Sequence, residues 1–125
     1  MKYYTEEHEW VEVAGNLATI GITAFAAAEL GDLTYIELPA VGKTITRGQP
    51  FCVVESVKAA SDVFAPIGGT VKEANQKLDS DPGIINSSPE TDGWICKVEG
   101  INPADLNGLM TAEQYAVFTA RAKKK

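Results

Sequence analysis

Hydrophobic and polar positions alternate over short stretches of the first hundred residues, and this period of two predicts β-strands. The clearest pair flanks Ala14-Gly15-Asn16, which is a good hairpin turn. Glycine or proline interrupts the pattern between most of the later stretches, as expected for turns. We predict strands at residues 10–13, 17–22, 33–38, 44–46, 51–56, 62–65, 70–74 and 94–98.

Two short helices are predicted from the residues at their ends. Thr23 is suited to cap a helix over residues 24–30, and Gly31 can end it. Asn102-Pro103 can open another short helix, because proline is well tolerated at the first helical position.

The C-terminus has the pattern of an amphipathic helix. Thr111 and Gln114 have the spacing of a capping box, in which each side chain bonds the backbone N–H of the other residue. Tyr115, Phe118 and Ala122 follow at helical spacing. These positions predict a helix with one apolar stripe.

Composition limits the kinds of partner. The chain has 125 residues, of which 45% are hydrophobic and 22% charged, as in an ordinary soluble domain. Its net charge of -6 would repel nucleic-acid phosphates, and no apolar run approaches the roughly 20 residues that span a bilayer. The acidic start, MKYYTEEHEW, resembles neither a secretory signal nor a transit peptide. We expect no nucleic-acid or membrane partner, and a location in the cytoplasm, or in the mitochondrial matrix for a processed organellar form.

Familiar catalytic and metal-binding motifs are absent from the sequence. Cys52 and Cys96 lie far apart in strand-like runs, where they are best interpreted as small buried hydrophobes. His8 is the only histidine, so a His-rich metal site cannot form. Neither GxSxG nor a phosphate-binding loop is present. We therefore expect no metal site and no catalytic residue.

Lys58 lies in the middle of an apolar run, VVESVKAASDV. On the preceding strand, Phe51 and Val53 are expected to point one way, and Cys52 and Val54 the other. The residues around the lysine itself are small or polar apart from one valine. This pattern predicts a tight protruding hairpin, anchored in the core on both sides, with Lys58 near its tip.

Three roles for this lysine are considered. It could be an ordinary exposed lysine, as most are. A nucleophilic or Schiff-base lysine needs a lowered pKa, whereas the neighbours Glu55 and Asp62 would favour the charged ammonium. The third role is a modification site, since a rigid turn presents one amine at a fixed place and Ala59 and Ala60 leave room for a modifying enzyme. The hairpin alone does not decide between the first role and the third.

Longer sequence blocks give the hairpin a context. They are HEWVEV (8–13), ATIGIT (18–23), LGD (30–32), IELPAVGK (36–43), VVESVKAASDV (53–63), API-GGTV (65–71), INSSP (85–89) and DGW (92–94). Together, in this order over almost the whole chain, they resemble the glycine cleavage system H proteins, in which ESVKA carries a lipoylated lysine. A biotin carrier would be expected to have methionines beside the lysine, as in MKM, whereas this chain has Val57 and Ala59.

The resemblance implies a carrier with no catalysis of its own, with lipoate on Lys58. Glycine decarboxylase (P protein) would pass the aminomethyl group of glycine to the lipoyl arm. Aminomethyltransferase (T protein) would take the one-carbon unit, and dihydrolipoamide dehydrogenase (L protein) would reoxidise the dithiol. A lipoate-protein ligase or octanoyltransferase would modify the lysine. The cofactor would hold the chemistry and the protein would present it.

The resemblance also assigns roles to four further residues. Glu9 and Asp62 would form the cleft that docks the ammonium of the loaded arm, although both could simply be solvated acids. Glu55 would help the lipoylating enzyme recognise the hairpin, unless it only stabilises the turn. Gly69, in a predicted Gly68-Gly69 turn, would be needed either for positive φ or for the approach of that enzyme.

Two segments depart from the family pattern. The family often has an aspartate and a glutamine after GIT, where this chain has Ala24-Phe25-Ala26-Ala27, so any polar contact at that helix start is in doubt. Glu7 stands before His8 where some relatives have a small polar residue. His8 is expected to form a local hydrogen bond with a structural role rather than to transfer protons, and Trp10 is expected to lie in the core.

We therefore predict a mainly β fold, a barrel-sandwich hybrid of the lipoyl/biotinyl type, with a short helix in the first half and a C-terminal helix. Residues 1–125 are expected to form one lipoyl-carrier domain, with the hybrid barrel at roughly 8–100 and the helical segment at roughly 102–122. Two alternatives remain. One is a relay protein that hands octanoyl or lipoyl groups to other enzymes, and the other is a plain binding module with unmodified Lys58.

Overall fold

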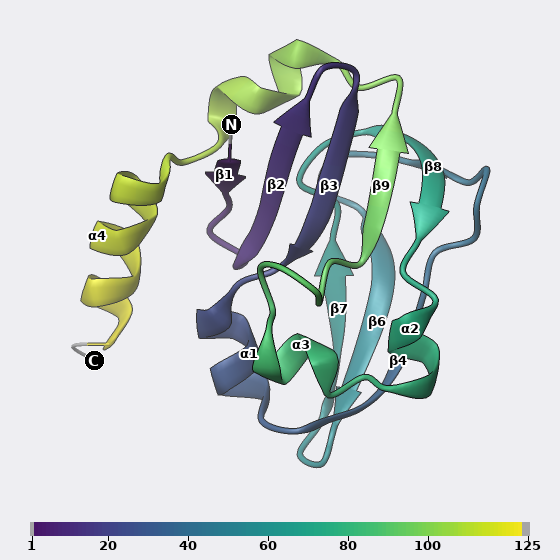
Figure 1. Cartoon of the computed structure of the whole chain (residues 1–125). Helices are drawn as coiled ribbons and strands as arrows, with labels where there is room; N and C mark the ends of the chain where they lie inside the picture. The colour runs from purple at the N-terminus through teal and green to yellow at the C-terminus, as the bar shows by residue number, and fades with distance from the viewer. Residues whose placement is uncertain (1, 124–125) are drawn as a thin grey trace.

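The computed structural model describes residues 2–123, and the side chains of residues 2–121. The strands pair in antiparallel fashion and form two sheets (Figure 1). The larger sheet has the order β1 (Lys2–Tyr4), β2 (Glu9–Ala14), β3 (Leu17–Ile22), β9 (Cys96–Glu99), β8 (Gly69–Ala74) and β5 (Thr44–Ile45). The smaller sheet has the order β4 (Leu33–Glu37), β6 (Pro50–Ser56) and β7 (Ala60–Phe64).

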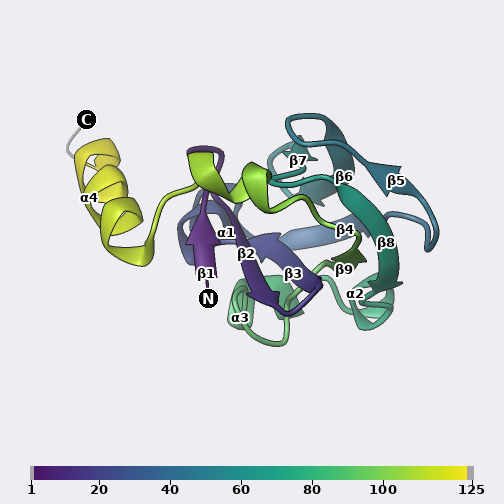
Figure 2. The ribbon, with the colours of Figure 1, turned by 90° about the horizontal axis from the view of Figure 1, so that it is seen from above.

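Short helices connect the strands and end the chain. They are α1 (Ala24–Leu30), α2 (Lys77–Ser80), α3 (Ile84–Ser87), the 3₁₀ helix η1 (Pro103–Gly108) and α4 (Ala112–Lys123). In both views α4 stands at the side of the molecule, beyond β1 (Figure 1 and Figure 2). The predicted mainly β fold with a short early helix and a helical C-terminus is confirmed.

The predicted helix ends are confirmed by their hydrogen bonds. The Thr23 hydroxyl accepts from the backbone N–H of Ala26, and Gly31 ends α1 with φ 79°. At the start of α4, the Thr111 N–H donates to the Gln114 side chain at 2.9 Å, and the Gln114 N–H donates to the Thr111 hydroxyl at 3.2 Å. This reciprocal pair is the predicted capping box.

Both sheets contribute to one core. Ala18, Ile20 and Ile22 all lie on the buried face of β3, as the alternation predicts. Val54 of β6 and Val63 of β7 belong to the same buried cluster, so the smaller sheet packs against the larger one. In the apolar stripe of α4, Tyr115 is buried and Phe118 is half-buried, while Ala122 lies outside the described side chains.

The two cysteines are free and buried, as predicted. Burial raises the pKa of the Cys52 thiol, and raises that of Cys96 to about 12. Both thiols therefore stay protonated at neutral pH and act as small hydrophobic side chains.

The prediction that Phe51 and Cys52 point to opposite faces of their strand was wrong. Phe51 and Cys52 are both 4% exposed, whereas strict alternation would place them on opposite faces. The register of the β6–β7 pair shifts between Pro50 and Cys52, which is a β-bulge or a similar irregularity. Such a shift lets two successive side chains enter the core. Beyond it, Val54 is buried and Val53 is only half-buried.

Neither β1 nor α2 was predicted. β1 has only three residues, too few for a pattern of alternation, and it is held by β2 and by a bridge in which Tyr4 and Met110 exchange backbone hydrogen bonds of 2.8 Å. α2 is a single turn in a polar segment with one buried leucine.

No helix within residues 2–123 is long and apolar enough to cross a membrane.

Gly21 provides a test of this packing. It pairs with Trp10 across β2 and β3, and a Cβ placed on it would lie 2.7 Å from the buried indole ring. We expect Gly21→Ala to lower the free energy of unfolding by about 1–3 kcal/mol, measured by urea denaturation, because the ring must shift from its position. Gly83→Ala is the control, since a Cβ there meets its nearest neighbour at an ordinary 3.4 Å and φ is −62°. Equal stability of the two variants would contradict the packing described.

Candidate functional site

The β6–β7 hairpin ends in a turn that is fixed by one serine. The Ser56 N–H donates to the carbonyl of Ala59 at 2.8 Å. The Ser56 hydroxyl accepts from the N–H groups of Lys58 at 3.1 Å and Ala59 at 3.2 Å. Val57 is 71% exposed, and the hairpin projects from one end of the molecule (Figure 1). The predicted protruding turn with Lys58 at its tip is confirmed.

The Lys58 side chain lies across the end of α1. It is exposed, and its Nζ donates to the carbonyl oxygen of Glu29 at 3.1 Å. Glu29 is in the last turn of α1, where the helix dipole is negative and attracts a cation. Gly31 leaves room for this contact, because a Cβ on it would lie 3.2 Å from the Lys58 Cε. One hydrogen bond to a backbone carbonyl thus holds an otherwise accessible amine.

Glu9 is a buried carboxylic acid near this hairpin. Only 3% of it is exposed, and its two oxygens accept from the Thr5 hydroxyl at 2.6 Å and the Phe64 N–H at 3.4 Å. Burial raises the pKa of Glu9 to about 7, and the two hydrogen bonds lower it only in part. Near neutral pH, small changes in its surroundings therefore decide whether Glu9 is charged.

Glu9 and Asp62 line the same small cavity, of about 150 Å³. Its walls come from residues 7–9, from α1, and from strands β3, β6 and β7. Asp62 is exposed at its edge. Glu29 also lines this cavity while its carbonyl holds the Lys58 amine. The structure thus brings the two predicted docking acids together, beside the base of the lysine-bearing hairpin.

The other two predicted residues lie in different places. The Glu55 side chain is exposed on β6, and its carbonyl accepts from the Thr34 hydroxyl at 3.2 Å. Gly69 begins β8, at the end of the molecule away from the hairpin (Figure 1). Positive φ at Gly69 was a wrong expectation, because it is not among the glycines with positive φ. A Cβ on Gly69 would lie 2.7 Å from the carbonyl oxygen of Glu99, so close backbone packing is what requires glycine.

His8 helps to hold the segment that carries Glu9. Its Nδ1 lies 2.8 Å from the Tyr115 hydroxyl, which is also 2.6 Å from the Thr23 hydroxyl. The imidazole stacks on Phe25 with ring centroids 4.4 Å apart, and burial lowers its pKa. His8 has φ 68°, an unusual conformation for a residue other than glycine. The expectation that the His8 side chain bonds locally was wrong, because its partner is Tyr115 of α4, 107 residues along the chain.

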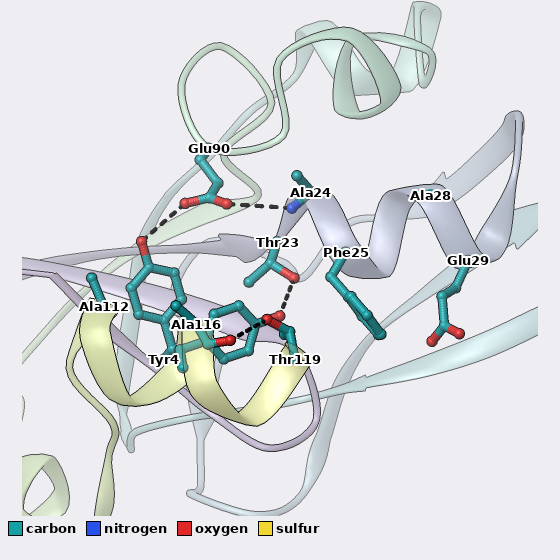
Figure 3. Close-up of a pocket in the computed structure, with 11 residues that line it drawn as sticks. Tyr4, Thr23, Ala24, Phe25, Ala28, Glu29, Glu90, Ala112, Ala116 and Thr119 are labelled. Atoms are coloured by element: carbon teal, nitrogen blue, oxygen red, sulfur yellow. Dashed lines mark hydrogen bonds between the residues drawn. The ribbon is translucent and has the colours of Figure 1, made fainter. Parts of the chain in front are cut away.

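Glu90 is a residue whose importance the sequence did not indicate. One of its oxygens accepts from the Tyr4 hydroxyl at 3.1 Å and pairs with Lys2 at 3.0 Å. The other accepts from the Ala24 N–H at 3.3 Å (Figure 3). A carboxylate distant in sequence therefore supplies the polar contact at the start of α1 that the local sequence put in doubt. Only the fold brings Glu90 to this place, so no local signal could have identified it.

Metal binding has no support in the described part of the chain. No group of three or more histidine, cysteine, aspartate or glutamate residues within it could hold an ion. The site itself contains an accessible amine and a neighbouring cavity with carboxyl groups.

Known proteins resemble the chain over most of its length. The family model described as glycine cleavage H-protein matches residues 2–122. The glycine cleavage system H protein of Phenylobacterium zucineum is 50% identical over 119 residues, which cover 95% of this chain and 98% of that protein. A relative from Schizosaccharomyces pombe, whose name assigns it to mitochondria and to the same system, is 46% identical over 117 residues. The matched region covers 94% of this chain and 69% of that protein.

A solved structure agrees with these matches. The crystal structure of a glycine cleavage system H protein from Mycobacterium marinum superposes with a TM-score of 0.86 at 34% identity. The alignment covers 95% of this chain and 96% of that one. The two-sheet arrangement is therefore the fold of those proteins.

The raised pKa of Glu9 predicts how its contribution to stability depends on pH. Between its ordinary value of 4.5 and about 7, the folded protein binds more protons at this group than the unfolded chain. The contribution of Glu9 therefore falls by roughly 3 kcal/mol as pH rises from 4 to 8. We expect Glu9→Gln to gain stability relative to the original chain over this range, measured by urea denaturation at several pH values.

Glu12→Gln is the matched control for this experiment, because Glu12 lies on the same strand and is exposed. Its difference from the original chain should not change in the same way with pH. If the Glu9→Gln difference is also flat from pH 4 to 8, Glu9 does not have the raised pKa described.

Proposed function

The chain belongs to the glycine cleavage H-protein family, and on this basis we propose that it is the lipoyl carrier of the glycine cleavage system, with lipoate on Lys58. The observation that carries this proposal is an exposed lysine at the tip of a fixed turn, beside a cavity with a buried carboxyl group. When bound, lipoate supplies the sulfur atoms that accept the aminomethyl group of glycine and later return to the disulfide. The rest of the site is made by the chain itself.

The residues around Lys58 suit a lysine that becomes an amide. Its amine forms one hydrogen bond, to the Glu29 carbonyl. The positive charge of the lysine strengthens this contact, because the C-terminal end of α1 is the negative end of the helix dipole. Acylation removes the charge of the lysine, so the modified side chain is no longer attracted to the negative end of α1. The turn stays fixed, because the hydrogen bonds made by Ser56 involve the backbone and not the lysine side chain.

The cavity suits a small ammonium group. The aminomethyl cargo carries such a cation, and Glu9 and Asp62 would receive it. With a pKa of about 7, Glu9 can ionise when a cation arrives beside it and return to the neutral form when the cation leaves. Burial of this carboxyl group would also keep the cargo away from bulk water. His8 and Tyr115 would act indirectly, by fixing the segment that holds Glu9.

The partners follow from this role. They would be glycine decarboxylase, aminomethyltransferase and dihydrolipoamide dehydrogenase, and a lipoate-protein ligase or octanoyltransferase would modify Lys58. Glu55 would contact the modifying enzyme, since its side chain is exposed close to the turn. Gly69 would contribute to lipoylation indirectly, through the packing of β8 on β9.

We also propose how many domains the carrier has and where in the cell it is located. We assign the whole chain to one carrier domain, because α4 is fastened to the β-structure by the contacts of Tyr115 with Tyr4, His8 and Thr23. The cytoplasm is the expected location in a bacterium, and the mitochondrial matrix in a eukaryote, in line with the bacterial and fungal relatives.

Substitution of the lysine tests the proposal most simply. We expect Lys58→Arg to accept no lipoate from a lipoate-protein ligase and to support no glycine–CO₂ exchange with glycine decarboxylase, because arginine keeps the charge but cannot form the amide. Lys43→Arg, at another exposed lysine, should behave like the original chain. Exchange activity that survives in Lys58→Arg would contradict the proposal.

Removal of a docking acid should shorten the life of the loaded carrier. We expect Glu9→Gln to be lipoylated normally but to lose the aminomethyl group roughly tenfold faster, since a hydrogen bond to a charged group contributes about 1.5–3 kcal/mol. Asp62→Asn should act in the same direction but less, because Asp62 is exposed and its charge is screened. The release of formaldehyde and ammonia from the loaded carrier measures the rate.

The same experiment has an internal control and a pH dependence. Asp79→Asn, at an exposed acid on α2, should leave the lifetime unchanged. In the original chain, cargo should be lost faster in acid, once Glu9 becomes protonated. This change should occur below the pKa of about 7 of the unloaded chain, because the bound ammonium favours the charged form of Glu9. Equal lifetimes for Glu9→Gln, Asp62→Asn and the original chain would rule out the docking role.

A further inference from the structure

A second and larger cavity shares one lining residue, Glu29, with the cavity of Glu9 and Asp62, which is called the acid cavity below. It is a groove of about 610 Å³ between α1 and α4 (Figure 3). Phe25 and Ala28 line it from α1, and Ala112 and Ala116 line it from α4. Alanine side chains leave this space open between two helices that are already fixed in place.

The groove is preformed by polar and aromatic contacts at its base. The Tyr115 hydroxyl is 2.6 Å from that of Thr23, which links α4 directly to the start of α1. Tyr4 stacks on Tyr115 with ring centroids 4.7 Å apart. Glu90 closes one end through its bonds to Tyr4 and Ala24 (Figure 3). A ligand could therefore enter this space without first separating the two helices.

The charge of the groove favours a cation. Glu29 and Glu90 both line it, and none of the described residues that line it is basic. Glu90 already pairs with Lys2. Among the described residues, the carboxylate of Glu29 has neither a hydrogen bond nor an ion pair, so it remains available. The combination of apolar walls and an available acid suits a lysine or arginine beside an apolar side chain.

The groove lies close to Lys58, because the two share contacts with Glu29. Glu29 lines the groove and also the acid cavity, while its carbonyl contacts the Lys58 amine. α1 therefore joins the groove to the hairpin tip as one rigid element. A protein bound in the groove would stand at a fixed place close to Lys58.

We propose that the groove between α1 and α4 binds a segment of a partner enzyme, which inserts an apolar side chain between the helices and sets a lysine or arginine against Glu29. This rests on the proposed carrier function, because the partners are the enzymes that the carrier visits. The carrier then docks through a surface that adjoins the one bearing the reactive lysine. Binding in the groove does not require a modified Lys58.

Filling the groove tests this directly. Ala116→Trp places a large side chain in it, whereas Val117→Trp places the same side chain on the next residue, which is 55% exposed and does not line the groove. Binding of the unmodified chain to purified glycine decarboxylase, aminomethyltransferase and dihydrolipoamide dehydrogenase is measured by titration calorimetry. We expect Ala116→Trp to raise the Kd for at least one of them about tenfold or more, and Val117→Trp to leave it near the original value.

A charge variant checks the second part of the proposal. Glu29→Gln should weaken the same complex and reduce its sensitivity to salt, while Glu113→Gln, at an exposed acid of α4 outside the groove, should do neither. Thermal unfolding of each variant confirms that it is folded. Equal Kd values for Ala116→Trp and Val117→Trp with all three enzymes, or no binding of the original chain to any of them, would overturn the proposal.

The binding experiments can fail independently of the tests of the carrier function. If Lys58 accepts no lipoate, the carrier function fails while the comparison of Kd values still stands. If lipoylation and glycine–CO₂ exchange are normal and the two tryptophan variants bind alike, only the groove is ruled out as the docking surface.

Discussion

The hydroxyl of Ser56 accepts hydrogen bonds from two successive backbone amides, and this small network fixes the turn from which Lys58 projects. Because the network uses backbone groups, chemistry at the lysine amine does not disturb it. The pairing of β6 with β7 and of β6 with β4 extends the same rigidity into the core. A long side chain attached at such a point can move while its base stays still, which is the main physical requirement for an arm that visits several sites.

The second requirement is a resting place close to that base. We place it at strand β2, which buries Glu9 where a carboxyl group is costly to ionise. The hydrogen bonds from Thr5 and Phe64 offset part of that cost. The unusual backbone of His8 and its contact with Tyr115 hold the preceding segment in place. The C-terminal helix therefore contributes to the site from a distance. It also forms one wall of the groove in which we place a partner enzyme.

Features with a local cause could be predicted from the sequence. The strands, the cap at Thr23, the capping box of α4 and the exposed turn at Lys58 each depend on a few neighbouring residues, and all were confirmed. Features that depend on long-range contacts could not be predicted. The register shift beside Phe51 needs its partner strand, the polar contact at α1 needs Glu90, and Gly69 is required by the carbonyl of Glu99. The two acids Glu9 and Asp62 were expected from family resemblance, and the folded chain then placed them in one cavity.

The central claim is that Lys58 carries a sulfur-containing arm in the cell, and the mass of the peptide that contains it tests this most directly. The protein should be purified from its native host during growth on glycine and digested without reduction of the sample. If Lys58 is the carrier lysine, this peptide is heavier than its sequence by one lipoyl group, and fragmentation places the added mass on Lys58. An unmodified amine at Lys58 in cells that degrade glycine through this protein would contradict it.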